Sequence, residues 1–374
     1  MRQKFKALGG EMELAPQTLT APLIHNILSQ LPSHQTVVTG RTGIKLILQA
    51  IKEELNGVFL LPAYLCSSVL QTFQEEKIEI AFYNINSDLS LDLMHLIKQV
   101  ENLSPQGIFF INYFGFPVAK KVKEALLNLK KQCWLIEDCV QGSLVEATHP
   151  VVGKIGHFSL TSFRKYLPLP DGGLVINNTQ HTLAYLPAIL SKFVRYRLFG
   201  KFLRYEFIHH YLNSSELEEI YLNLFAAAER ELDTQTPMQG MSEISQDLLK
   251  RLNLSDAMER RRSNFLSILQ AFTETPKLQS LGVPLIAQLP EGVSPLVFPL
   301  RVREKKRDQL RHQLQSQNVF CPIHWHLPQE VQVTEFPEAH QISKEILSLP
   351  IDQRYTKDDM NSLIDQLLIA YQNI

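Results

Sequence analysis

The sequence has little of what marks several protein classes. Its 374 residues carry 37 basic and 38 acidic side chains, a formal charge of −1, so it lacks the net basic surface that a nucleic-acid-binding protein normally needs. No apolar run approaches the roughly 18 residues of a membrane span. The opening MRQKFKALGGEMEL has no apolar segment behind its basic residues, so it does not predict a signal peptide. We therefore expect a globular protein that binds neither nucleic acid nor membranes.

Cysteine is also scarce. None of the four cysteines forms a C-x-x-C pair, and no Cys/His cluster suggests zinc. His324 and His326 stand one residue apart, which indicates a metal only with a third ligand. We therefore expect reduced thiols, no metal site and a cytoplasmic location. The cysteines are Cys66, Cys133, Cys139 and Cys321.

The first half alternates between two patterns. Helical spacing of apolar residues predicts helices at Thr42–Leu55, Leu89–Val100 and Val118–Leu129. Such alternation predicts an α/β fold with a mostly parallel sheet between helices, and in such sheets ligands bind beyond the carboxyl ends of the strands. The predicted strands are Phe59–Leu61, Ile78–Ile85, Gly107–Asn112, Cys133–Ile136, His157–Ser162 and Leu174–Asn177.

The pattern changes after Asn178. Residues 179–235 look almost wholly helical and include the basic and aromatic stretch Lys192–Phe207. A nucleic-acid or membrane face is one interpretation. We favour an amphipathic helix pair that packs by its aromatic side while its arginines extend to solvent, because the whole chain is not basic.

A length of 374 residues favours two domains. A helix from Glu243 to about Leu269 precedes a new α+β pattern. We predict an N-terminal arm at 1–22, a large domain at 23–240 with a helical insert at 179–235, and a small C-terminal α+β domain at 241–374. The elements expected after that helix are the strand Leu296–Val302, the helix Lys305–Gln317, the strand Phe320–Ile323 and the helix Lys357–Gln372.

Three features of the large domain are candidates for chemistry. Asp138 follows a buried strand, where it is a ligand-binding carboxylate or a helix N-cap. Lys165 follows another strand and precedes the Asp171-Gly172-Gly173 turn. Thr39–Gly43 opens a strong helix, whose free N–H groups attract anions, but it is neither a Walker A loop nor a dinucleotide motif.

These three features together describe a pyridoxal-phosphate site. The helix start holds the phosphate, and the aspartate pairs with the pyridine nitrogen and keeps the ring an electron sink. The lysine forms the Schiff base and moves the proton. The chemistry needs these three types of group, and here they stand in one order, with Asp138 about 100 residues after the helix start and Lys165 27 residues further.

The chain resembles the DegT-type sugar aminotransferases, a family of fold-type I pyridoxal-phosphate enzymes. The matching segments span almost the whole chain in family order. They are TGRTGIKLIL (Thr39–Leu48), LPAYLCSSV (Leu61–Val69), INYFGFP (Ile111–Pro117), IEDCVQGS (Ile136–Ser143), FSLTSFRKYLPLPDGGLV (Phe158–Val175), MSEIS (Met241–Ser245) and LSLPI (Leu347–Ile351).

The resemblance assigns the catalytic roles to Lys165, as Schiff-base lysine and proton shuttle, and to Asp138. It places Gln141 near the ring hydroxyl of the cofactor. The phosphate would be held by the Gly40-Arg41-Thr42 segment and by a serine. Ser162 matches the Ser-x-x-Lys spacing of related aminotransferases, and Ser159 is the competing candidate.

Two departures from the family concern the cofactor ring and the phosphate. The family usually has an aromatic side chain where Cys66 stands, and Tyr64, which shares a face with it in an extended segment, is expected to stack on the ring instead. Met238-Gln239-Gly240 stands where the family typically has an Asn-Tyr-Arg segment that reaches the partner subunit's phosphate.

Two further residues are candidate substrate contacts. His324 lies in the region where the family has residues close to the substrate. Arg164 would bind a substrate carboxylate or phosphate, or simply form an ion pair.

The resemblance implies a homodimeric transaminase that moves an amino group from a donor such as glutamate to the keto group of a sugar or sugar-like acceptor. A pyridoxal-phosphate-dependent lyase or dehydratase is an alternative, although dehydratases of this kind replace the lysine with histidine. A non-catalytic binding protein on the same fold is a third hypothesis, which the presence of both Asp138 and Lys165 disfavours.

Overall fold

A seven-stranded sheet forms the centre of the computed structural model, which describes residues 7–24, 26–142, 153–211, 214–234, 236–303 and 306–374. The strands that come second to sixth along the chain, β3 to β7, run parallel to one another. The last strand, β8, is antiparallel to β7, and the first, β2, is antiparallel to β8. This is the predicted α/β fold with a mixed, mostly parallel sheet. In spatial order the strands are β2 (His34–Val37), β8 (Gly173–Asn177), β7 (Phe158–Ser162), β6 (Trp134–Asp138), β5 (Gly107–Ile111), β3 (Phe59–Pro62) and β4 (Ile80–Tyr83).

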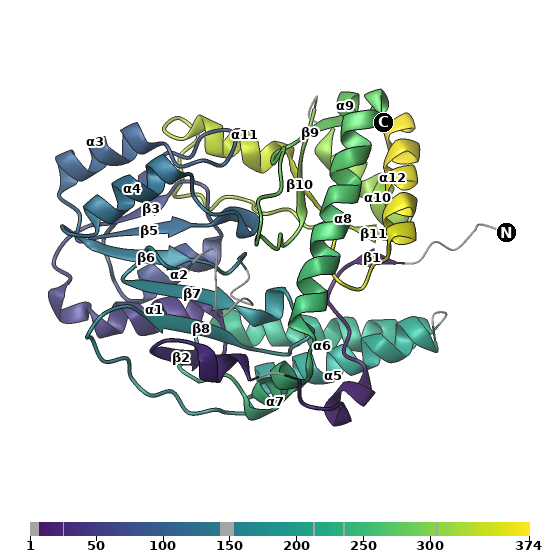
Figure 1. Cartoon of the computed structure of the whole chain (residues 1–374), viewed down its shortest axis with the longest axis horizontal. Helices are drawn as coiled ribbons and strands as arrows, with labels where there is room; N and C mark the ends of the chain where they lie inside the picture. The colour runs from purple at the N-terminus through teal and green to yellow at the C-terminus, as the bar shows by residue number, and fades with distance from the viewer. Residues whose placement is uncertain (1–6, 25, 143–152, 212–213, 235, 304–305) are drawn as a thin grey trace.

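Helices connect the strands of this sheet (Figure 1). The predicted helix Thr42–Leu55 is α1 (Gly40–Ala50), which ends in a separate short turn at Lys52–Glu54. The other connecting helices are α2 (Ser67–Glu75), α3 (Leu93–Leu103) and α4 (Lys120–Leu129).

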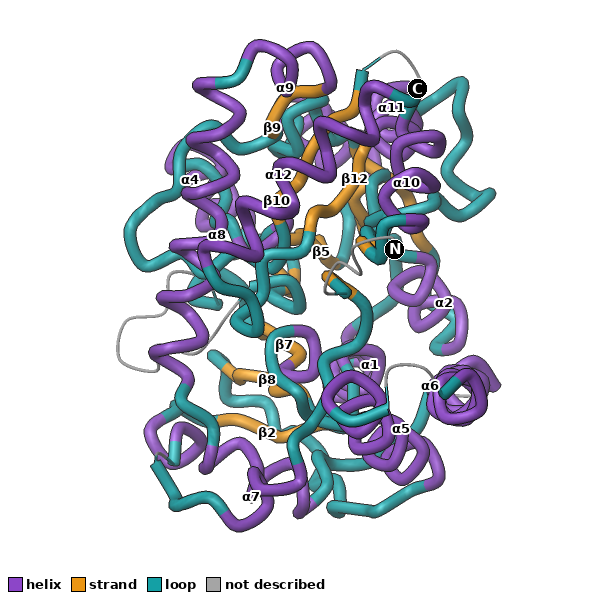
Figure 2. Tube along the Cα trace, turned by 90° about the vertical axis from the view of Figure 1, so that its right-hand side faces the viewer, coloured by secondary structure: helices purple, strands orange, loops and turns teal. Residues whose placement is uncertain are grey.

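The insert contains two helices that pack along each other, α5 (Lys192–His209) and α6 (Ser215–Thr234), seen nearly end-on in Figure 2. Helix begins only at Lys192, because residues 179–191 form an extended segment that contains Pro187 and bridges to Gly240 through Ala188. The prediction of an almost wholly helical insert is therefore wrong for its first part. Residues 212–213 and 235 of the insert lie outside the described residues.

Three basic residues of α5 point inward rather than to solvent, whereas Lys192 and Arg195 are exposed. Arg197 and Lys201 are almost fully buried and Arg204 is 8% exposed, whereas Phe199 is 56% exposed. The three cations lie at positions i, i+4 and i+7, so they share one face of the helix. The prediction that the arginines of this helix extend to solvent is wrong for these residues, because carboxylates of the N-terminal arm and of α6 lie against that face.

A single helix was expected from Glu243 to about Leu269, but the structure has two. The chain is extended at Leu252 and Asn253, and the Asn253 side chain caps the second helix by accepting from the Asp256 N–H at 3.1 Å. Leu248 and Leu249 of the first helix pack in the larger core, although the predicted boundary at 240 places them in the small domain. The two helices are α7 (Glu243–Arg251) and α8 (Leu254–Glu274).

The C-terminal elements gather beside one end of the large sheet and form a second core (Figure 1). Three of their strands form an antiparallel sheet in the order β12-β10-β9. The elements of this region are α9 (Pro276–Leu281), β9 (Gly282–Pro284), β10 (Phe298–Val302), α10 (Arg307–Ser316), β11 (Val319–Phe320), α11 (Pro337–Glu345), β12 (Ile346–Leu349) and α12 (Lys357–Gln372). Among them, α11 packs against the larger core through Ala339 and Ile342. Lys305, where we expected a helix to start, lies outside the described residues.

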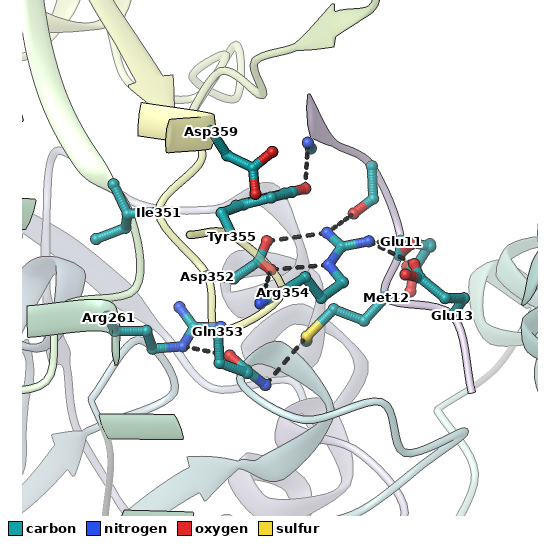
Figure 3. A network of polar contacts seen from close by, with 12 residues as sticks. Glu11, Met12, Glu13, Arg261, Ile351, Asp352, Gln353, Arg354, Tyr355 and Asp359 are labelled. Atoms are coloured by element: carbon teal, nitrogen blue, oxygen red, sulfur yellow. Dashed lines mark hydrogen bonds and ion pairs between the residues drawn. The ribbon is translucent and has the colours of Figure 1, made fainter. Parts of the chain in front are cut away.

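The N-terminal arm crosses from this second core to α5. Its strand β1 (Leu8–Gly9) pairs in parallel with β11, and Leu8 is part of the second core. Figure 3 shows how the arm is fixed: Arg354 donates to Glu13 Oε2 at 2.7 Å and to the Glu11 carbonyl oxygen at 3.2 Å. On its other side, Lys201 of α5 donates to the Met12 carbonyl oxygen at 2.8 Å. Residues 1–6 of the predicted arm lie outside the described residues.

Candidate active site

A cavity of about 310 Å³ lies at the carboxyl ends of the central strands. It is lined by Asp138 from the end of β6, by Lys165 from the turn that follows β7, and by Gly40 from the start of α1. The three features that the sequence placed in one site therefore meet in one cavity. This position follows from the parallel sheet, whose strands all end at the same edge.

The start of α1 contributes backbone to the cavity wall. Thr39 caps the helix by accepting from the Thr42 N–H at 3.3 Å, and Gly40 and Arg41 line the cavity. The Arg41 guanidinium points to α6, where it donates to Asp233 at 3.1 Å. Thr42 does not line this cavity, and its hydroxyl donates to the Pro237 carbonyl oxygen at 2.8 Å.

The two candidate serines lie on opposite faces of the sheet. Ser159 pairs with Glu137 in the strand register and donates to the Gly153 carbonyl oxygen at 3.1 Å and to Glu137 at 3.4 Å. Ser162 lies three residues along β7, on the other face, and lines the cavity. Its hydroxyl is buried and has no hydrogen-bond partner among the described residues. The structure thus brings Ser162 to the site and directs Ser159 away from it.

Asp138 lines the cavity and accepts a hydrogen bond from the Val140 N–H at 2.7 Å. The residues described directly after it, 139–142, form a turn rather than a helix, so this bond is not a helix cap within the described residues. Burial raises the pKa of its carboxyl to about 7, although the Val140 bond and the charge of Lys165 act in the opposite direction. A cationic ring nitrogen in the cavity would stabilise the ionised form of this carboxyl.

Lys165 is exposed to the cavity but enclosed by the surrounding protein. This burial lowers the pKa of its amine, and the neighbouring Arg164 charge lowers it further. Both effects favour the neutral amine, which is the form that attacks a carbonyl carbon.

The other predicted ring contacts divide between the cavity and its surroundings. Gln141 lines the cavity, and its Oε1 accepts from the Phe114 N–H at 2.9 Å. Cys66 also lines it. Tyr64 does not line it: its ring is fully buried and its hydroxyl donates to the His324 carbonyl oxygen. Ser143, the last residue of one matched segment, lies outside the described residues.

An aromatic wall is nevertheless present, and it comes from Trp325. This residue lines the cavity, and its ring centroid lies 5.6 Å from that of Tyr64. The prediction that Tyr64 stacks on the cofactor ring is not supported by this arrangement, because Tyr64 lies behind Trp325. The sequence contained the signal in the His324-Trp325-His326 stretch, where only the histidines were considered.

A second cavity, of about 370 Å³, meets the first at Arg164, Lys165 and His324. It is walled by the N-terminal arm and by the C-terminal core. His324 Nδ1 lies 2.8 Å from Ser348 Oγ, and burial lowers the pKa of its imidazole to about 3, with a further contribution from the Lys165 charge. His324 is therefore neutral near pH 7.

Sequence reasoning missed two further contributions. Glu229 and Leu232 of α6 line the first cavity, and Glu11 of the N-terminal arm lines the second. The pattern of the insert predicts only packing helices, and that of the arm predicts no role, because nothing in either segment shows which part of the sheet it covers.

The side chains fit pyridoxal phosphate. Ser162 offers a buried hydroxyl without a partner, and the start of α1 offers backbone N–H groups beside it. Among the described residues, no group of three or more His, Cys, Asp or Glu side chains could hold a metal ion. None of the described helices is long and apolar enough to cross a membrane.

Comparison with known proteins gives the same picture. The sequence model of the DegT/DnrJ/EryC1/StrS aminotransferase family matches residues 33–368. PseC of Helicobacter pylori, an aminotransferase involved in the biosynthesis of pseudoaminic acid, superposes with a TM-score of 0.69 at 15% identity, over 99% of this chain and 100% of that chain.

Two further solved structures have the same fold. The putative sugar aminotransferase Spr1654 of Streptococcus pneumoniae, in its PMP form, has a TM-score of 0.66 at 14% identity and covers 98% of this chain and 94% of its own. The sugar aminotransferase CalS13 of Micromonospora echinospora has a TM-score of 0.64 at 14% identity and covers 97% and 99%. No curated protein matches the sequence.

Proposed function

The chain belongs to the DegT/DnrJ/EryC1/StrS aminotransferase family, and we propose that it uses pyridoxal 5'-phosphate to move an amino group from glutamate to the keto group of a sugar or sugar-like acceptor. The observation that supports this most is the meeting of Lys165, Asp138 and Ser162 with the start of α1 in one cavity. Bound pyridoxal phosphate forms a Schiff base with an amine and acts as an electron sink.

Four groups of this chain would hold the cofactor by its polar ends. The Ser162 hydroxyl and the N–H groups of Gly40 and Arg41 bind the phosphate, in agreement with the anion preference of a helix start. The Asp138 carboxylate binds the pyridine N–H.

The ring of the cofactor has its own contacts. Gln141 would lie near the ring hydroxyl, and Cys66 and Trp325 would pack against the ring, because all three line this cavity. These assignments use side chains that line the same cavity.

Lys165 acts through its Nζ atom. As a neutral amine, Nζ would hold the cofactor through its aldehyde carbon, with release of water. When the substrate amine has taken its place, Nζ would carry a proton from the substrate α-carbon to the carbon that was the aldehyde, on the other side of the nitrogen. The lowered pKa of this amine supports the assignment, because a permanently charged ammonium could do neither.

His324 is a substrate contact in this proposal. It lines both cavities beside Lys165, and it is neutral near pH 7. With Nδ1 engaged by Ser348, the second ring nitrogen can donate to or accept from an acceptor hydroxyl.

The proposal includes a homodimer in the cytoplasm. The resemblance to fold-type I enzymes supports the dimer. The four cysteines, all free in the structure, support a reducing compartment.

A half-reaction tests this function. Cofactor-loaded protein mixed with glutamate, without an acceptor, should form one 2-oxoglutarate per active site and convert the cofactor to its amine form. Lys165→Ala should abolish this turnover, whereas Lys277→Ala, which changes an exposed lysine of α9, should leave it intact. A lyase would release ammonia and leave the cofactor aldehyde unchanged, and a binding protein would do neither, so either outcome would overturn the proposal.

A further inference from the structure

Five charged side chains from distant parts of the chain form one cluster beside Lys165. They are linked by ion pairs: Glu11 contacts Arg197 and Lys201 of α5, and Glu229 of α6 contacts Arg197 and Arg164. We call this set, Glu11, Arg164, Arg197, Lys201 and Glu229, the charge cluster. It joins the N-terminal arm, the turn that carries the lysine, and both helices of the insert.

The two cations of α5 are well satisfied. Arg197 lies 2.6 Å from Glu11 Oε1 and 2.7 Å from Glu229 Oε1, and its side chain is 2% exposed. Lys201 is fully buried and donates to Glu11 Oε2 at 3.2 Å and to the Met12 carbonyl oxygen at 2.8 Å. Neither side chain can reach a ligand.

Arg164 is the cation of the cluster with the weakest contact. Its guanidinium lies 3.3 Å from Glu229 Oε1, an oxygen that is already closer to Arg197. Its side chain is 16% exposed, and it lines both cavities together with Lys165. Without Lys165, the cluster contains three cations and only two carboxylates. One positive charge is therefore in excess, and Arg164 is the cation of the cluster that lines the cavities.

We propose that Arg164 binds the carboxylate of the amino donor. This inference rests on the proposed transamination. An amino acid that reacts beside Lys165 carries its carboxylate on the same carbon as its amine, so that carboxylate must lie within a few ångströms of the lysine. A guanidinium can bind it through two parallel hydrogen bonds and neutralise the excess charge.

The second cavity favours a donor carboxylate over the cofactor phosphate as the partner of Arg164. The start of α1 and Ser162, which fit the phosphate, line the first cavity only, whereas Arg164 lines both. Two other arginines line the second cavity. Arg311 donates through Nε to the Cys321 carbonyl oxygen at 3.0 Å, Arg261 donates to backbone carbonyl oxygens, and neither lines the first cavity. Of the described arginines that line the second cavity, only Arg164 therefore also lines the first, where the cofactor would lie.

Glutarate, a dicarboxylate without an amine, tests this binding without reaction. Titration calorimetry of glutarate into the cofactor-loaded protein should give an affinity that Arg164→Gln weakens about tenfold to hundredfold, the effect of losing hydrogen bonds to a charged group. Arg164→Lys should recover part of the loss, because a lysine keeps the charge but not the paired contacts. Arg311→Gln is the comparison within the second cavity. Arg260→Gln, on the exposed side of α8, is the control outside both cavities.

The steady-state constants give a second readout. Arg164→Gln should raise KM for glutamate far more than it lowers kcat, and Arg164→Lys keeps the test possible if the glutamine variant does not fold. The inference is overturned if the wild type binds no glutarate, or if Arg311→Gln rather than Arg164→Gln lowers the affinity for glutarate. It is also overturned if Arg164→Gln lowers the affinity for the cofactor and leaves that for glutarate unchanged. If glutarate binding depends on Arg164 but glutamate yields no 2-oxoglutarate, the carboxylate site stands and the proposed transamination fails.

Discussion

Glu11 Oε1 lies 2.6 Å from a guanidinium nitrogen of Arg197. This ion pair joins the N-terminal arm to α5 across 186 positions of the sequence, and Glu229 continues it to Arg164 at the active site. The arm therefore helps to position the Arg164 side chain indirectly, through Arg197 and Glu229.

Replacing Glu11 should destabilise the protein. Glu11→Gln leaves two buried cations with fewer partners, and breaking a fully buried pair costs about 3–5 kcal/mol. Because the Glu11 side chain is 37% exposed, we expect a smaller loss, about 1–3 kcal/mol. Urea unfolding should show this as a lower midpoint with an unchanged slope. Glu219→Gln, an exposed change on α6, is the matched control, and an equal loss there would refute the pairing account.

The same carboxylate gives a pH dependence. Burial alone would raise the pKa of Glu11, but the charges of Arg197 and Lys201 hold it well below its usual value. A carboxyl with a lowered folded pKa stabilises the protein above its unfolded pKa of about 4.5, and this contribution is lost as the pH falls further. The difference in stability between wild type and Glu11→Gln should therefore shrink below about pH 4.5. A constant difference down to pH 2 would contradict it.

Ser162 and Ser159 should have opposite phenotypes. Ser162→Ala removes a hydroxyl without a partner in the described residues, so it should leave the stability of the cofactor-free protein unchanged. It should weaken the binding of pyridoxal phosphate about tenfold to hundredfold. Ser159→Ala removes the hydrogen bonds to Gly153 and Glu137, so it should cost about 1 kcal/mol of stability and spare the cofactor. Thermal unfolding and cofactor titration of both variants separate the roles, and the reverse pattern would show that Ser159 is the phosphate ligand.

These two serines also show what a sequence can and cannot predict. Asp138, Lys165 and the α1 start, together with the family segments around them, were enough to predict the cofactor, and the alternation of strand and helix patterns was enough to predict the α/β fold. The phosphate ligand must be the serine on the same face of the sheet as Asp138. The register of β6 with β7 decides which of Ser159 and Ser162 that is. Since no local pattern reveals that register, both serines remained candidates.

The helical insert was harder to predict for a different reason. A stretch rich in arginine and aromatic residues normally buries its rings and exposes its cations, and here Arg197 and Lys201 are buried together with Phe193. The residues that make this possible, Glu11 and Glu229, lie far from them along the chain. Such ion pairs depend on the tertiary structure, so the composition of one helix does not predict them.

The stability of the cofactor-free protein should depend on pH through the carboxyl of Asp138. Burial raises the pKa of this carboxyl to about 7 in the folded protein, above its unfolded value. The stability that this shift contributes is fully present below the unfolded pKa of about 4 and is lost as the pH rises through 7. Relative to Asp138→Asn, the cofactor-free wild type should therefore lose stability between about pH 4 and pH 7. Parallel curves would show that the carboxyl has an ordinary pKa.

Arg164 should set the pH at which Lys165 takes up the cofactor. The amine of Lys165 has a pKa lowered by burial and then by the Arg164 charge, and only the neutral amine binds the aldehyde. Arg164→Gln removes the charge, so the midpoint of the pH profile for cofactor uptake should move to higher pH. Stopped-flow absorbance of the cofactor-free protein mixed with pyridoxal phosphate would measure it. A midpoint that does not move, or that falls, would contradict the assigned effect.

The most direct test of the account is chemical trapping of the cofactor. Protein loaded with pyridoxal phosphate should be reduced with borohydride, digested and mapped by mass spectrometry. The account predicts a single pyridoxyl-phosphate adduct, on Lys165, together with loss of the bound-cofactor absorbance in Lys165→Ala. An adduct on another lysine, or a protein that stays colourless with added pyridoxal phosphate, would contradict it.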